Sequence, residues 1–220
     1  TVTAAKLSGS GATSGQVLAY NGSAVAWTTP AGGITGSGTT NQLALWSGSA
    51  SLIGNSTLVY SSSKLGVGTG SPSASLHVSG NDGILAQGTF GSGTSLSPGA
   101  GTRVHWYSKK AAFRAGEVTT AIWDDANVGQ HSVAFGKNNL ANGQYSSAFG
   151  SNNTASGASS TAFGTSNTAS GQYSTAIGYF AQASGQSAIA AGTTCTASGN
   201  AAIAIGNNCL ATQASAVAIG

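Results

Sequence analysis

Residues 144–157 read QYSSAFGSNNTASG, and residues 158–171 repeat them as ASSTAFGTSNTASG. The same fourteen-residue unit recurs without insertion or deletion through the C-terminal part of the chain. A period this strict means that each unit lies on the one before it, because a slip would misalign every later unit. The sequence therefore predicts a stacked repeat with an architectural role.

When the units are aligned, equivalent positions hold the same type of residue, and each such set of positions is called a column here. One column is glycine, and the two columns before it are alanine and, in most units, a large apolar residue. Because neighbouring strand residues point to opposite faces, one face is small and the other mostly large, and we expect both to be buried. The glycine column is Gly136, Gly150, Gly164, Gly178, Gly192, Gly206 and Gly220, and the packing columns include Ala134, Ala148, Ala162, Ala176, Phe135, Phe149, Phe163, Ile177 and Ile205.

A second glycine recurs in the other half of the unit, from Gly143 to Gly199, and an alanine column precedes it by two residues. We expect a coil of two strands of about four residues each, joined by tight turns in which glycine supplies the positive φ. Successive coils would stack about 4.8 Å apart through parallel pairing. The fold class is all-β, a thin parallel β-roll, since no apolar period of 3.6 residues predicts a helix.

Residues 138–220 contain no Asp, Glu, Lys, Arg or His. This fits in-register stacking, because a repeated charge would meet its own copy about 4.8 Å above and below. Such a roll has little interior, since a coil offers at most one large side chain and several alanines. The simplest cover for its outer strand face is an identical roll, and a closed ring of three copies provides it. We therefore expect a homotrimer.

Composition excludes several classes of protein. Charged residues make up 5% of the chain, against roughly 25% in an ordinary soluble domain. A hydrophobic content of 40% with few charges is unlike that of a disordered chain. The sequence has no polybasic arm that would predict a nucleic-acid partner. It also has no stretch of about 18 apolar residues that would predict membrane insertion. The chain has no Met and no signal-like segment, so we expect a piece of a longer protein.

Changes in composition and in repeat pattern along the sequence predict four segments. Residues 1–35 form a Gly/Ser-rich segment of short strands. Residues 36–80 have similar short apolar alternations separated by turns, and we expect them to form a β stalk. Residues 81–131 carry most of the charge and form a connector and roll cap. Residues 132–220 form the β-roll of fourteen-residue repeats.

The repeats SSAFG at 146–150 with TASG at 154–157, and STAIG at 174–178 with ASG at 183–185, resemble the head repeats of YadA-type trimeric autotransporter adhesins. The resemblance implies a left-handed parallel β-roll, a homotrimer, and binding to host or matrix surfaces. Bacteriophage tail fibres carry the same repeat, and LGVGTGSP at 65–72 with LHVSG at 76–80 is similar to a motif common in those fibres. Phage fibre and cell-surface fibre therefore both remain open.

Candidate chemical sites are few. Trp123, Asp124 and Asp125 predict a cap at the start of the roll, and the alternative of a calcium loop would need more carboxylates at alternating positions. The spacing of His77, His105 and His131 suggests no metal site, and we expect no cofactor. Cys195 and Cys209 share one column, so they are either a disulfide between stacked coils or two buried or turn thiols.

These features predict a structural fibre protein rather than an enzyme, displayed outside a cell, on its surface or on a virion. Its partners would be identical chains and an unknown surface receptor or glycan. One alternative is an extracellular filament joined end to end, in which a partner pairs with the uncapped edge at Gly220. Another is a glycan-binding module that uses Tyr145 and Tyr173, which share a column.

Overall fold

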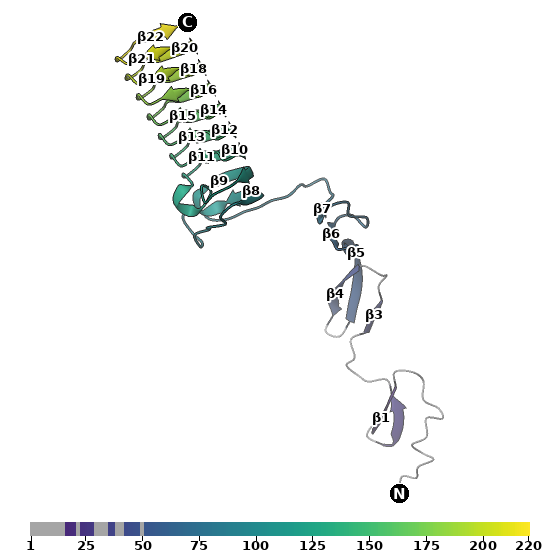
Figure 1. Cartoon of the computed structure of the whole chain (residues 1–220). Helices are drawn as coiled ribbons and strands as arrows, with labels where there is room; N and C mark the ends of the chain where they lie inside the picture. The colour runs from purple at the N-terminus through teal and green to yellow at the C-terminus, as the bar shows by residue number, and fades with distance from the viewer. Residues whose placement is uncertain (1–15, 21–22, 29–34, 38–41, 49–50) are drawn as a thin grey trace. The chain divides into compact units, whose positions relative to one another are not determined.

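A computed structural model describes residues 16–20, 23–28, 35–37, 42–48 and 51–220 (Figure 1). The chain divides into two units, residues 1–85 and 86–220. Over the described residues every regular element is a strand, apart from the 3-10 turns η2 (Ser108–Lys110) and η3 (Asp125–Asn127). No helix in this part of the chain is long and apolar enough to cross a membrane. The all-β class is confirmed.

The first unit holds strands where apolar residues alternate in the sequence, and most of them are short, although β5 has 11 residues. The hairpin β1 (Val17–Tyr20) and β2 (Val25–Thr28) is antiparallel. A second sheet is built around β5 (Ser51–Ser61), which pairs antiparallel with β4 (Gln42–Gly48) and β6 (Lys64–Val67) and parallel with β3 (Thr35–Ser37). β7 (Leu76–Val78) adds parallel to β6. The finer boundaries at 35 and 80 stay predictions, and much of 1–35 lies outside the described residues.

The second unit is a regular parallel stack that follows a hairpin (Figure 1). β8 (Gly101–Tyr107) and β9 (Ala112–Val118) are antiparallel, and β9 pairs parallel with the first repeat strand. One sheet runs from β8 and β9 through the long strands β10 (Val133–Lys137), β12 (Ser147–Ser151), β14 (Thr161–Thr165), β16 (Thr175–Tyr179), β18 (Ile189–Thr193), β20 (Ile203–Asn207) and β22 (Val217–Ile219). The other sheet holds the short strands β11 (Leu140–Ala141), β13 (Thr154–Ala155), β15 (Thr168–Ala169), β17 (Gln182–Ala183), β19 (Thr196–Ala197) and β21 (Leu210–Ala211).

The repeat columns become ladders in register. Ala148 pairs with Ala162, Phe149 with Phe163 and Gly150 with Gly164, and the same register holds up the stack. The predicted parallel β-roll of fourteen-residue coils is thereby confirmed.

The internal geometry of the coil differs from the expectation. Full coils hold strands of five and two residues, rather than two of about four. Residues other than glycine hold the positive φ of both turns, such as Asn152 at 55° and Tyr145 at 58°. The prediction that glycine supplies the turn conformation is therefore wrong. These residues donate their main-chain N–H to the preceding coil, as Asn152 does to the Lys137 carbonyl at 2.8 Å, and such contacts offset the cost of the left-handed conformation.

Both glycine columns instead make room for the next coil. A Cβ on Gly150 would overlap the carbonyl oxygen of Gly164, and a Cβ on Gly157 would overlap that of Gly171. Gly150 also has a φ of 111°, but it lies within β12 rather than in a turn. The glycine period therefore reflects the close approach of successive coils.

The interior of the roll is narrow and mostly alanine. Ala148 and Ala155, from the two strands of one coil, are both fully buried, as are most of their counterparts. Beside them runs a ladder of buried asparagines, Asn139, Asn153 and Asn167. Each Nδ2 donates to main-chain carbonyls, and each Oδ1 accepts from a main-chain N–H in the coil above at 2.8–3.0 Å. Buried amides are thus satisfied, and successive coils are tied together.

Only one face of the long strands is buried within the chain. The alanines point into the roll, whereas Phe163 and Ile205 on the opposite face are 54% and 41% exposed. Strand alternation turns the large residues away from the alanine interior, so the outer face is exposed in the single chain and its burial by an identical roll stays a prediction.

Candidate interaction surface

The outer face is the side of the β8–β22 sheet opposite the alanines. In the repeats it is formed by the residues one and three positions before each repeat glycine, which point to the same side. The large apolar members from β10 onward are Val133, Phe135, Phe149, Phe163, Ile177, Ile189, Ile203, Ile205, Val217 and Ile219. Most are at least partly exposed, and exposure reaches 76% at Ile219.

Aromatic rings make a continuous ladder over the first coils of this face. The ring centroids of Phe113 and Phe135 lie 5.3 Å apart, those of Phe135 and Phe149 5.5 Å, and those of Phe149 and Phe163 6.3 Å. Rings at such separations support one another's orientation. The outer face is therefore an ordered apolar surface rather than a set of scattered side chains.

Trp123 and Arg114 are both buried at the start of the roll. The Trp123 side chain is fully buried against the alanine core, and its Nε1 donates to the Asn139 carbonyl at 2.8 Å. Arg114 is also fully buried, and its guanidinium donates to the carbonyls of Ser132 at 2.8 Å and Ala141 at 2.9 Å. Burial lowers the pKa of Arg114 to about 10, which leaves it charged at neutral pH.

Sequence reasoning missed Arg114, although a signal for it exists. FRAG at residues 113–116 matches the pattern of a large residue, an interior residue, a second outer residue and glycine. β9 pairs with β10 so that Gly116 lies opposite Gly136 and Arg114 opposite Ala134. Arg114 therefore occupies the interior alanine column one strand before the repeats begin.

Asp124 and Asp125 hold the segment that precedes the roll. Asp124 Oδ1 accepts from the Gly99 N–H at 2.8 Å. Asp125 Oδ1 accepts from the Tyr107 hydroxyl at 2.5 Å and lies 3.4 Å from Lys110 Nζ. The hydrogen bond from Tyr107, and then the charge of Lys110, hold the pKa of Asp125 below its ordinary value. Both carboxylates thus make structural contacts, and the cap assigned to them stays a prediction.

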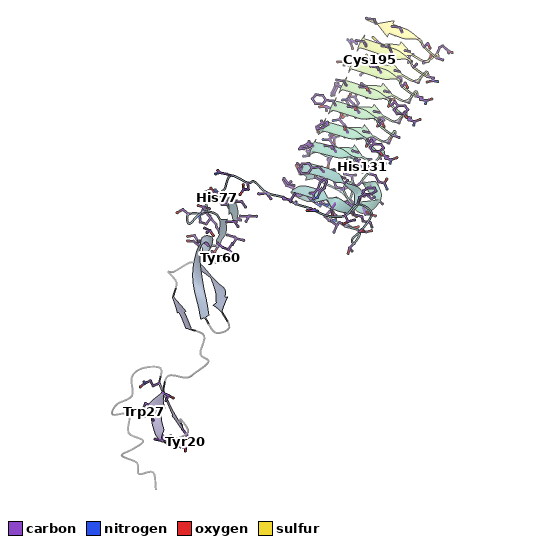
Figure 2. The ribbon with its side chains drawn as sticks, turned by 180° about the vertical axis from the view of Figure 1, so that it is seen from behind. Tyr20, Trp27, Tyr60, His77, His131 and Cys195 are labelled. Carbon is purple, nitrogen blue, oxygen red and sulfur yellow. The ribbon has the colours of Figure 1, made fainter. Side chains whose placement is uncertain are left out.

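Cys195 and Cys209 are buried free thiols in the column that the asparagines occupy lower in the stack; Figure 2 labels Cys195 in the later coils. Cys195 Sγ donates to the Gly206 carbonyl at 3.2 Å, and Cys209 Sγ to the Ile205 carbonyl at 3.1 Å. Burial, and then Cys195 beside it, raise the pKa of the Cys209 thiol. A disulfide between them remains a hypothesis.

Exposed aromatics stand in one column of turns at the edge of the roll. Tyr145 and Tyr173 are each 55% exposed. The Tyr145 ring stacks on His131 at 5.1 Å, and His131 stacks on Phe90 at 4.8 Å. Figure 2 shows His131 at the start of the roll.

The remaining histidines lie apart from this column. His77 belongs to β7 in the first unit, where its Nδ1 accepts from the Ser73 N–H at 3.3 Å. His105 lies on β8, and burial, then Arg103 and Arg114, lower its pKa. Among the described residues, no group of three or more His, Cys, Asp or Glu could hold a metal ion.

The geometry defines a class of protein, a repeat β-roll with one apolar sheet face. The family model described as YadA head domain repeat (2 copies) matches residues 128–153, 155–181 and 183–208. Residues 128–208 therefore belong to the YadA head repeats. A search of curated proteins found no match. The YadA head is an adhesin-type structural module, and proteins of this family are surface-exposed homotrimers.

Proposed function

We propose that the chain is a structural fibre or adhesin subunit whose roll joins two identical rolls in a homotrimer. The trimer would form a rigid head for surface attachment, displayed at a cell surface or on a virion. The outer face carries this proposal, because contiguous exposed apolar surface on a soluble protein marks an interaction site. The alanine interior cannot cover these side chains, since they point away from it.

An identical roll suits the outer face better than an unrelated partner. The face repeats with the spacing of the coils, about 4.8 Å, so a parallel copy presents matching ladders at every level. Residues 138–220 contain no Asp, Glu, Lys, Arg or His whose charge would repel its own copy. The homotrimeric state of the YadA family supports three copies.

The substitution Phe163→Asp tests the homotrimer. It places a charge on the outer face of β14, at a side chain that is 54% exposed in the single chain, so the fold of the monomer should survive. Leu210→Asp is the matched control, because Leu210 is 64% exposed but lies on β21 in the other sheet. We expect analytical ultracentrifugation to give trimers for the wild type and Leu210→Asp, and monomers for Phe163→Asp. A monomeric wild type, or a trimeric Phe163→Asp, contradicts the proposal.

Micrographs of the same material distinguish the fibre subunit from a self-assembling filament. Discrete particles of fixed length support the fibre or adhesin head. Long uniform fibres with an axial repeat would support subunits joined end to end.

A glycan-binding role is the second candidate, favoured by the exposed rings of Tyr145 and Tyr173. Gln144 and Gln172 directly precede these tyrosines. Each forms a side-chain hydrogen bond with a glutamine one coil away: Gln144 Nε2 donates to Gln130 Oε1 at 3.5 Å, and Gln172 Oε1 accepts from Gln186 Nε2 at 3.4 Å. Aromatic faces beside amides can pack on and hydrogen-bond a neutral sugar. We expect saturable glycan-array binding that the double substitution Tyr145→Ala/Tyr173→Ala abolishes. Tyr60→Ala, also 55% exposed, is the control, and absence of binding by the wild type rejects this role.

A further inference from the structure

The hairpin β8–β9 lies outside residues 128–208, which match the family repeats, yet it continues the same sheet. β9 pairs with β10 in parallel register, with Phe113 opposite Val133 and Ala115 opposite Phe135. Directly paired residues of adjacent strands point to the same side. The outer face therefore extends from the repeats onto β9.

The outer face extends one strand further, onto β8, which pairs antiparallel with β9. Trp106 on β8 pairs with Phe113, and Val104 pairs with Ala115. Trp106 is 43% exposed and Val104 is 74% exposed. The outer face thus begins on β8, where a large aromatic and a β-branched residue remain in solvent in the single chain.

The other side of the hairpin is anchored in the protein. Tyr107 and Ala112 are buried in a small cluster with Val128, and Arg114 lies inside the roll. Arg103, which also alternates away from the outer face, donates to the Gly99 carbonyl at 2.7 Å. The hairpin is therefore fixed within the second unit, with Trp106 and Val104 on its exposed side.

We infer that the β8–β9 hairpin is part of the self-association surface and that Trp106 and Val104 pack against a second copy of this chain. This inference rests on the proposed homotrimer. Continuity supports it, because copies that align their repeats also bring their hairpins to the same level. Chemistry supports it as well, since Val104, Trp106, Phe113 and Ala115 carry no charge, and Glu117 at the end of β9 is paired with Lys137 at 3.6 Å.

The substitution Trp106→Ser in the full chain tests the inference. It removes the exposed ring without touching the repeats, and we expect the concentration at which trimers dissociate to rise at least about tenfold. Trp106→Leu keeps an apolar side chain and should remain close to the wild type. Tyr173→Ser is the matched control, because it removes an exposed ring from a turn rather than from the outer face.

Sedimentation across a dilution series measures the concentration at which trimers dissociate. If Trp106→Ser fails to fold, the same measurement on Val104→Ser tests the inference. Weaker association for Trp106→Ser and Val104→Ser, with Tyr173→Ser unchanged, supports the inference. Unchanged association for both hairpin variants overturns it, whereas the homotrimer stands if Phe163→Asp is monomeric. A wild type that is itself monomeric removes the homotrimer proposal instead.

Discussion

At the scale of single residues, close approach between coils explains the composition of the roll better than turn chemistry does. Glycine occupies the positions where the next coil's carbonyl takes the place of a side chain, as at Gly157 beneath Gly171. The turns accept tyrosine, serine and asparagine at positive φ. Steric exclusion by the main chain is thus the constraint that repeats every fourteen residues.

The substitution Gly157→Ala tests this constraint. The added methyl group would overlap the Gly171 carbonyl oxygen, so we expect the free energy of unfolding to fall by about 1–3 kcal/mol. Gly80→Ala adds the same methyl group in open space and should leave stability nearly unchanged. Equal denaturation midpoints for the two variants would show that the coils can separate to admit a side chain.

The two cysteines give a second prediction at this scale. Their thiols are buried, and burial raises the pKa of Cys209, so little reactive thiolate is available. We expect iodoacetamide to modify both cysteines in the unfolded chain and neither in the folded one, as read by intact mass. A mass that changes on reduction alone would instead demonstrate the Cys195–Cys209 disulfide.

At the scale of elements, the segment before the repeats is held by polar contacts that the repeats lack. Trp123 and Arg114 fill the first coil, while Tyr107, Lys110 and Asp125 join β8, η2 and η3. A solenoid needs such a structure where stacking ends, since the terminal coil has no neighbour on one side. The charges of the second unit gather here because no identical coil repeats them.

Acid should weaken this segment before it affects the repeats. Asp125 has a lowered pKa in the folded chain, so its carboxylate stabilises the fold above the unfolded value of about 3.9. That stabilisation is lost as the pH falls through the lower folded value. We expect the melting temperature of the wild type to fall below about pH 4 by more than that of Asp125→Asn. Asp82→Asn, an exposed position in the first unit, should follow the wild type.

At the scale of the whole molecule, the roll has an interior too small to bury its large side chains. The core of the second unit consists mostly of alanine, whereas phenylalanine and isoleucine remain on the outer face. Hydrophobic stabilisation scales with the apolar area removed from water, and much of that area is still exposed in one chain. Association would therefore supply a large part of the stability.

The melting temperature should accordingly depend on protein concentration. If identical copies bury the outer face, mass action raises the melting temperature as the concentration rises. Added salt should not reduce this concentration dependence, because residues 138–220 carry no charges to screen. Calorimetry over a dilution series provides the measurement, and a melting temperature independent of concentration would mean that the single roll is stable alone.

The sequence by itself determined the period, the parallel stack and the all-β class. It could do so because every unit repeats the same local alternation of small and large residues, and a register that suits one coil suits all. Only the tertiary structure decided what lies at the start of the roll. Trp106 turns outward because β8 pairs with β9, and pairing between unlike segments depends on sheet register, which no repeat in the sequence records.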